Sequence, residues 1–249
     1  MTIEKQLAVI SDIHGNSFAL KAVLEDIHNR KIHTIVNLGD SLYGPLDPVN
    51  TAEILMDLTI PSVCGNEDRI LLFHSEDELE KNSSLSYVMD LIDSKIRKWL
   101  NKLQKIIEYD NMVLFHGTPN NDSEYFFEKV TKHGVKIKKN EELESLISSF
   151  NQELILCGHS HIPRSIYLQR GQLIINPGSI GLPAYVDSTP YPHIMENGVP
   201  HARYCIITKN KNQWYIENIS VPYNWKKAAS IALMNGRSDW AKWLQYGRV

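Results

Sequence analysis

The sequence predicts an α/β fold built in layers, because apolar runs of strand length alternate with segments of helical periodicity. The first pair is the run at residues 7–11 and, after a polar break, a segment in which Leu20, Val23, Leu24 and Ile27 recur at helical spacing. With 43% hydrophobic and 22% charged residues among 249, the composition is that of a globular chain with a sizeable core.

The same alternation continues through the first half of the chain. Residues 33–38 and 60–64 are predicted strands, and residues 48–58 form a predicted helix between them. Residues 83–103 are expected to form a helix that covers the sheet, because apolar side chains share one side of it: Leu85, Val88, Ile92, Ile96, Trp99 and Leu103.

A second set of strands is expected in the other half of the chain. These strands are residues 112–115, 154–157, 173–175, 204–208 and 214–219. The last two form a predicted hairpin around the polar turn at 209–212. Residues 225–246 are predicted to form two short amphipathic helices with a break near Asn235 and Gly236. Their packing anchors are expected to be Trp225, Trp240 and Trp243.

We expect one domain over residues 1–249, with a helical extension at about residues 224–249. Residues 177–200 are rich in Pro and Gly and lack a clear periodicity, which predicts a functional or mobile loop. This loop and the C-terminal helices are expected to shape access to the candidate site. His193 and His201 lie in or beside the loop, and structural roles are expected for both in preference to contact with substrate.

Charge and cysteine content narrow the class of partner. The formal net charge of −3 gives no support to broad attraction toward nucleic acid or an anionic membrane. Cys64, Cys157 and Cys205 lie in or at the end of apolar runs, which predicts buried, reduced thiols. Residues 1–10 lack a basic segment followed by a long apolar stretch. We therefore expect a cytoplasmic protein with no membrane partner and no requirement for nucleic acid.

Seven Asp, Asn and His side chains occur where predicted strands end. They are Asp12, His14, Asp40, Asn66, His116, His159 and His161. Ligands bind at the carboxyl edge of the strands in open α/β sheets, so these side chains are expected to converge on one site. A glycine adjoins each turn and is expected to take positive φ, which lets the chain leave the strand sharply. These glycines are Gly15, Gly39, Gly65, Gly117 and Gly158.

The seven side chains have the composition of a dinuclear metal site. They exceed what one tetrahedral ion needs, whereas two ions that share a carboxylate would use them all, with Asp40 as the natural bridge. The absence of cysteine among them argues against a structural zinc site, and imidazole with carboxylate suits Mn²⁺, Fe, Co²⁺, Ni²⁺ or Zn²⁺. We expect two divalent transition-metal ions, with Mn²⁺ as the first choice.

Five short motifs, in this order, resemble the calcineurin-like metallophosphoesterase superfamily. They are DIH at 12–14, LGD at 38–40, GNED at 65–68, FHG at 115–117 and GHSH at 158–161. The stretches NPGSIGLP at 176–183 and ARYCII at 202–207 are similar to its small prokaryotic phosphodiesterase branch. The resemblance covers most of the chain and implies a β-sandwich with helices on both outer faces.

The resemblance also implies a ligand set and a mechanism. One metal would be held by Asp12, His14 and His161. The other would be held by Asn66, His116 and His159, with Asp40 as the bridge. Asp40, Asn66 and His116 would act in catalysis through the metals, whose bound hydroxide would attack a small phosphate ester, either a phosphodiester or a nucleotide polyphosphate.

The sequence departs from the superfamily pattern at Glu67. Many members carry His at this position, where it assists the leaving group or binds phosphate, and the acid that follows corresponds to Asp68. Glu67 could act as a general acid if burial raised its pKa, and a local contact is the alternative. Asp68 could cap the following helix or support the ligands from behind. The change favours an altered substrate scope over inactivity.

Two other functions stay open. A phosphomonoesterase, including a protein phosphatase, would use the same metals, but the missing imidazole disfavours it. A non-catalytic scaffold of the same fold would bind partners instead. Such scaffolds normally have broken metal motifs, whereas all seven positions are intact in this sequence.

Overall fold

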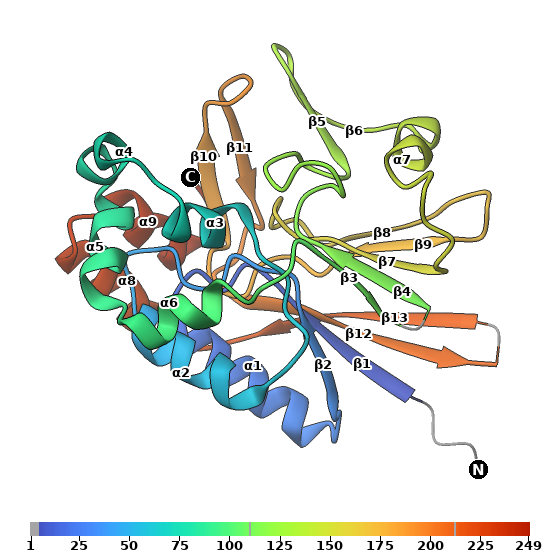
Figure 1. Ribbon diagram of the computed structural model, residues 1–249, viewed down its shortest axis with the longest axis horizontal. Helices are drawn as coiled ribbons and strands as arrows, with labels where there is room; N and C mark the ends of the chain where they lie inside the picture. Colours follow the sequence, from blue (N-terminus) through green and yellow to red (C-terminus); the bar gives the residue numbers. More distant parts are fainter. Residues whose placement is uncertain (1–4, 110, 212) are drawn as a thin grey trace.

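The computed structural model describes residues 5–109, 111–211 and 213–249, and its main feature is a pair of mixed β-sheets (Figure 1). One sheet has the order β13–β12–β1–β2, formed by Gln213–Val221, Ala202–Asn210, Lys5–Ile10 and Thr34–Asn37. The other has the order β3–β4–β7–β9–β8, formed by Ile106–Tyr109, Met112–Phe115, Leu154–Leu156, Leu173–Asn176 and Arg164–Tyr167. The layered α/β fold and the sandwich implied by the resemblance are confirmed.

The core of the sandwich follows from the alternation of side chains along each strand. In β1, Leu7 and Val9 pack between the sheets, whereas Ala8 and Ile10 pack on the outer side. Both sheets complete the inner layer with apolar residues: Val36, Leu114, Leu154, Leu156, Leu173, Ile175, Cys205 and Ile207. Successive side chains of a strand point to opposite faces, so an uninterrupted apolar strand contributes to two hydrophobic layers.

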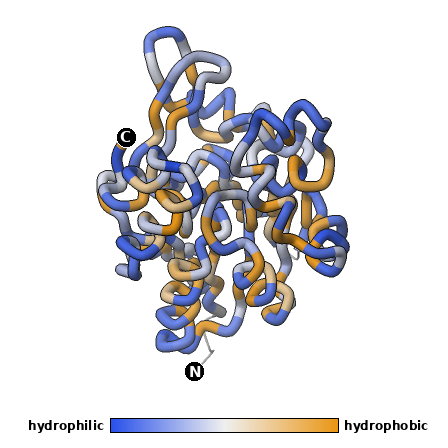
Figure 2. Tube along the Cα trace, turned by 90° about the vertical axis from the view of Figure 1, so that its left-hand side faces the viewer, coloured by the Kyte–Doolittle hydropathy of each residue, from blue (hydrophilic) through white to orange (hydrophobic). Residues whose placement is uncertain are grey.

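Helices cover the outer face of both sheets. Helix α1 (Ser17–Asn29) places Leu20 and Val23 against the first sheet. Helix α7 (Asn140–Leu146) places Leu143 against the outward-pointing residues of β4 and β7. Apolar and polar residues alternate along the helices at the lower edge of the molecule, as their amphipathic packing requires (Figure 2).

The helix expected at residues 83–103 is divided in two. Asp93 begins a new helix because its Oδ1 accepts a hydrogen bond from the backbone N–H of Ile96 at 2.8 Å. The two parts pack mainly on the neighbouring helices of this region, and Trp99 of the second part also packs against the hydrophobic cluster that includes residues of β1. The expectation that this segment covers the sheet therefore holds only in part. The helices of this region are α2 (Pro48–Leu58), α3 (Asn66–Leu72), α4 (Glu76–Lys81), α5 (Ser83–Leu91) and α6 (Ser94–Leu100).

The prediction of a strand at residues 60–64 is also wrong. This segment makes two isolated bridges, from Ser62 to Asn37 and from Val63 to Gln104. Because the two bridges join it to different partners, no continuous ladder forms.

Two hairpins project from the same end of the sandwich (Figure 1). The strands β10 (Ala184–Asp187) and β11 (His193–Glu196) pair within the segment expected to be an irregular loop, which corrects that expectation. The other hairpin, β5 (Glu128–Thr131) with β6 (Gly134–Ile137), was not predicted.

The C-terminal helices are confirmed as α8 (Trp225–Met234) and α9 (Ser238–Tyr246). Trp240 and Trp243 are buried in one cluster, whereas Trp225 is half-buried outside it. The predicted hairpin β12–β13 is also confirmed, although Asn212 of its turn lies outside the described residues, as do residues 1–4 of the amino-terminal segment.

The cysteines are free thiols. Cys157 and Cys205 are buried as expected, whereas Cys64 is only half-buried. Within the described part of the chain, every helix is too short or too polar to span a membrane.

Candidate metal centre

Parallel strand pairs bring the predicted side chains to one edge of the sandwich. Strand β1 runs parallel to β2, and β4 runs parallel to β7, so the segments that follow each pair begin on the same side. These segments carry the side chains predicted from the sequence, with Asp12 and His14 after β1, Asp40 after β2, His116 after β4, and His159 and His161 after β7. Asn66 is the first residue of α3.

Left-handed backbone conformations are concentrated at these positions. Among the described residues other than glycine, eight have positive φ, and five of the eight are predicted ligands: Asp12 (53°), His14 (52°), Asp40 (52°), His159 (71°) and His161 (61°). Each such residue costs on the order of 1 kcal/mol or more, and conformations of this kind cluster at functional sites. The fold therefore tolerates repeated backbone strain at a single site.

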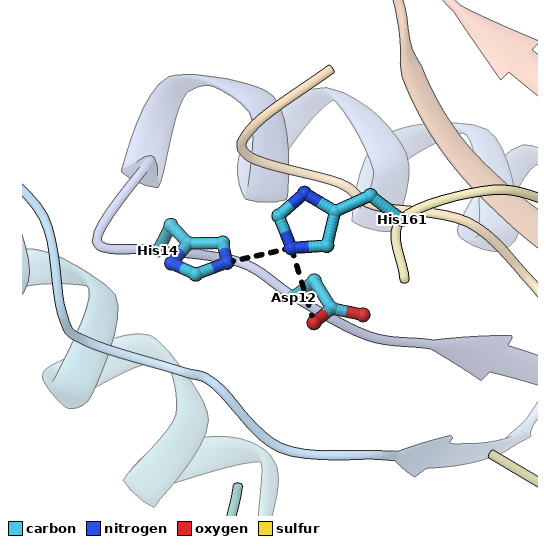
Figure 3. Close-up of side chains that lie close together, drawn as sticks. All are labelled: Asp12, His14 and His161. Carbon is cyan, nitrogen blue, oxygen red and sulfur yellow. Dashed lines mark hydrogen bonds and ion pairs between the residues drawn. The ribbon is translucent and has the colours of Figure 1, made fainter. Parts of the chain in front are cut away.

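Asp12, His14 and His161 form the first cluster, and all three are buried (Figure 3). Nε2 of His14 lies 3.0 Å from Nε2 of His161, which lies 3.4 Å from Oδ1 of Asp12. Nδ1 of His14 lies 3.0 Å from the carbonyl oxygen of Tyr43, and Nδ1 of His161 lies 2.8 Å from that of Leu182. Burial, helped by His161, lowers the pKa of His14 to about 4, so its imidazole is neutral, the form that binds metals.

Asp40, His116 and His159 form the second cluster. Nε2 of His116 lies 3.1 Å from Oδ2 of Asp40 and 3.9 Å from Oδ1 of Asp12, so the two clusters adjoin. Nδ1 of His116 lies 2.7 Å from the carbonyl oxygen of Leu38. Burial opposes protonation of His116, but Asp40 and Asp12 outweigh it and raise its pKa to about 10. In the metal-free protein the two carboxylates therefore favour a positive charge at this position, which a bound metal ion would supply.

The side chain of Asn66 also has a feature expected of a metal ligand. Its Oδ1 atom is buried and has no hydrogen-bond partner among the described residues, although buried acceptors in proteins normally have one. Together with the facing Nε2 atoms and the carboxylates, this oxygen makes a donor set that fits divalent transition-metal ions.

Asp68 ties together the loops that carry two of the predicted ligands. It is fully buried and accepts hydrogen bonds from the backbone N–H of Ser41 at 2.9 Å and of Gly65 at 3.1 Å. The second bond caps helix α3, and the first holds the residue next to Asp40. The two roles expected for Asp68 therefore coexist in one side chain.

Glu67 lies beside the second cluster. Its backbone N–H donates to Oδ1 of Asp40 at 2.8 Å, and its side chain lines the hollow above the clusters. Burial, and then the charge of Asp40, raise the pKa of Glu67 to about 8, which keeps the carboxyl largely protonated near neutral pH.

The glycines beside the ligands serve in two ways. Gly15 and Gly39 have positive φ as expected, at 64° and 94°. The expectation is wrong for Gly65, Gly117 and Gly158, which lack positive φ. At Gly65 the reason is close approach, because a Cβ atom would collide with the carboxylate of Asp40.

A hollow of about 290 Å³ opens above the clusters. The sequence did not single out several residues of its wall, among them Tyr43, Tyr125, Tyr185, Asp187 and Arg237. Strand β10 and helix α9 both contribute to this wall, in keeping with the expectation that the loop and the C-terminal helices shape access to the site, whereas α8 contributes no lining residue.

Three side chains of this region form a hydrogen-bonded chain. Oη of Tyr185 donates to Oη of Tyr125 at 2.9 Å, and Oη of Tyr125 lies 2.9 Å from Nε2 of His193. The ring centroid of Tyr125 lies 4.7 Å from that of His159, and Tyr185 meets His161 at the same separation. His193 is buried and has the structural role expected of it.

The sandwich with two buried clusters of Asp and His at one edge is that of a metallophosphoesterase. A family model described as the calcineurin-like phosphoesterase superfamily domain matches residues 6–194. The chain therefore belongs to the calcineurin-like phosphoesterase superfamily, a group of hydrolases that use divalent metals.

Similar proteins agree with this family. The chain is 30% identical to an uncharacterised protein of Methanocaldococcus jannaschii, with 96% of each chain covered. A metallophosphoesterase from Sphaerobacter thermophilus has a similar crystal structure, with a TM-score of 0.77, 22% identity, and 98% and 99% of the two chains covered. A candidate diadenosine tetraphosphatase gives a TM-score of 0.54 at 19% identity, with 89% and 96% covered. At these identities the two crystal structures support the fold alone.

Proposed function

We propose that the chain is a dinuclear metal-dependent phosphoesterase that hydrolyses a phosphodiester or a nucleotide polyphosphate. The observation that carries this is the junction of two buried clusters whose ring nitrogens and carboxylates face one another. Asp12, His14 and His161 would hold one ion. Asn66, His116 and His159 would hold the other, with Asp40 as the bridge. Ions held by these residues would supply an activated water as the nucleophile and positive charge to offset that of the phosphoryl oxygens.

The remaining residues of the site orient these ligands. The backbone carbonyls of Tyr43, Leu182 and Leu38 each hold Nδ1 of one imidazole, so that its Nε2 points into the site, where it could bind a metal ion after losing any proton. The backbone N–H of Glu67 holds Asp40. Because Glu67 replaces the usual imidazole, leaving-group protonation by that imidazole is absent, which favours diesters over monoesters as substrates.

Manganese is the proposed metal, with Fe, Zn, Ni or Co as substitutes, because the ligands mix imidazole with carboxylate and include no thiolate. The partner is proposed to be a small phosphate ester in the cytoplasm. A phosphomonoesterase is the second candidate, since the same clusters would serve it.

The test is hydrolysis of bis(p-nitrophenyl) phosphate beside p-nitrophenyl phosphate by chelated protein reconstituted with Mn²⁺. We expect metal-dependent activity that favours the diester and disappears in Asp40→Asn. Preference for the monoester would support the second candidate. If the protein stays folded but has no activity with Mn²⁺, Fe, Zn, Ni or Co, the proposal is contradicted.

A further inference from the structure

A groove of about 830 Å³ adjoins the metal hollow. It lies between the hairpin β10–β11 on one side and the hairpin β5–β6 with helix α7 on the other (Figure 1). Four residues line both spaces: Asn66, Tyr125, His159 and Asp187. A substrate whose phosphorus lies at the clusters can therefore extend into the groove. Pockets of about 300 to 1,000 Å³ hold organic groups of nucleoside size or larger.

The groove is acidic. Its lining includes five carboxylates and two ammonium groups: Glu124, Glu128, Glu141, Glu142 and Asp187 against Lys129 and Lys138. Both lysines are already paired, Lys129 with Glu142 at 2.6 Å and Lys138 with a second glutamate at 2.8 Å. Glu128 is paired with Arg164 at 3.3 Å. Among the described residues that line the groove, no other lysine or arginine pairs with Glu141 or Asp187.

Glu128 adds a buried hydrogen-bond acceptor to the groove. The residue is only 4% exposed, and its Oε1 accepts a hydrogen bond from Nε of Arg164 at 3.3 Å. Its Oε2 makes no hydrogen bond of normal length in the described part of the chain, although the side chain of Ser160 interacts with the carboxyl and lowers its pKa against the larger effect of burial. A buried acceptor of this kind is costly to leave unpaired, so its position in the wall of a groove indicates a donor supplied by a ligand.

We propose that the groove receives the leaving group of the phosphodiester, and that this group carries hydrogen-bond donors and no negative charge, as a nucleoside does. The proposal rests on the proposed function and selects between its two substrate classes. In the reaction, water supplies the new oxygen on phosphorus, the ester P–O bond breaks, and the leaving oxygen takes up a proton to depart as an alcohol.

The negative charge of the groove favours one of the two proposed substrate classes, the phosphodiesters or the nucleotide polyphosphates. The hydroxyls of a sugar can donate to Glu128 and Glu141. A phosphate chain offers only acceptors and negative charge, and it would have to pass Asp187 at the entrance to the groove. A diester that releases an uncharged alcohol is therefore favoured over a nucleotide polyphosphate.

The test compares two substrates in protein reconstituted with Mn²⁺. Adenylyl adenosine releases uncharged adenosine, whereas the leaving group of diadenosine tetraphosphate is a nucleoside polyphosphate. Wild-type protein should have the higher kcat/KM for adenylyl adenosine. Glu141→Lys should lower the ratio of kcat/KM for adenylyl adenosine to kcat/KM for diadenosine tetraphosphate roughly fivefold, because it reverses an exposed charge in the groove wall. Glu25→Lys, the same change at an exposed position of α1, should leave it unaltered.

A higher kcat/KM of the wild type for diadenosine tetraphosphate would overturn the inference. An equal change in the ratio of the two kcat/KM values in Glu141→Lys and Glu25→Lys would overturn it as well. Activity on bis(p-nitrophenyl) phosphate is measured on the same preparations. If that activity is absent, the proposed function has failed, and the inference about the groove is not the cause. Calorimetric binding of adenosine tests the groove without turnover. Glu128→Gln should weaken this binding about tenfold. Adenosine binding that is absent in the wild type, or unaffected by Glu128→Gln, would refute the role of the groove.

Discussion

Nε2 of His14 faces Nε2 of His161 across 3.0 Å. A backbone carbonyl can only accept a hydrogen bond, so the Nδ1 atoms that contact the carbonyls of Tyr43 and Leu182 carry the protons. Both Nε2 atoms therefore face each other, with the carboxylate of Asp12 beside them. Two ring nitrogens and a carboxylate at these distances call for a cation between them, either a proton or a metal ion, so this corner of the fold suits a cation.

Asp40→Asn should lower the metal-dependent kcat/KM for bis(p-nitrophenyl) phosphate on the order of a hundredfold or more. The amide lacks the charge of a carboxylate that contacts His116 and adjoins both clusters. Glu67→Gln is the control, because it keeps the backbone N–H that holds Asp40, and it should retain most of the activity. Near-wild-type turnover in Asp40→Asn would exclude the bridging role.

Asn66→Ala should separate metal binding from folding. Because Oδ1 of Asn66 has no partner in the described part of the chain, the free energy of unfolding in chelator should change little, while the rise in Tm on adding Mn²⁺ should shrink. Asn176→Ala is the contrasting variant, since that side chain bonds to the backbone of Gly158 and Gly178. It should lose about 2 kcal/mol even in chelator. Equal losses in chelator for the two variants would contradict the ligand role of Asn66.

The predicted ligands were accessible to sequence reasoning because each signal is local. His116 directly follows an apolar strand, and Asp12 follows another after a single intervening residue. The chain between Tyr125, Tyr185 and His193 was not accessible, because its partners lie 60 and 68 residues apart and no periodicity links them.

Errors in the predicted elements also have local causes. Residues 83–103 keep a helical pattern of apolar residues across Asp93, although Asp93 caps a second helix. Residues 60–64 have the composition of a strand, but composition does not reveal that their two backbone bridges go to different partners. The hairpin β10–β11 was hidden by the Pro and Gly residues around it, which predict turns more strongly than pairing.

Tyr125→Phe should cost about 1 to 3 kcal/mol in the free energy of unfolding, because it leaves Nε2 of the buried His193 without its donor. Metal binding should change much less, since phenylalanine keeps the ring that packs on His159. Urea unfolding and metal titration measure the two effects. Tyr167→Phe, at an exposed ring on β8, is the matched control and should be neutral. Equal free energies of unfolding in Tyr125→Phe and Tyr167→Phe would show that the hydrogen bonds of the Tyr125 hydroxyl do not stabilise the fold.

Glu128 should make stability depend on pH. Burial raises the pKa of Glu128 above its ordinary value of 4.5, so the folded state holds this proton more tightly than the unfolded state does. The wild type therefore loses stability as pH rises through the folded pKa, whereas Glu128→Gln cannot ionise. The stability of the variant relative to the wild type should increase in chelator as the pH rises above about 4.5, the ordinary pKa of the carboxyl. A difference that is constant, or that falls with pH, would contradict this.

Metal content per chain tests the dinuclear centre most directly. After reconstitution with Mn²⁺ and dialysis, elemental analysis of the wild-type protein should find two ions per chain. His14→Ala, in the first cluster, and His159→Ala, in the second, should each remove one ion. A wild-type chain that retains one ion or none, or variants that both retain two, would contradict a two-ion centre built from these clusters.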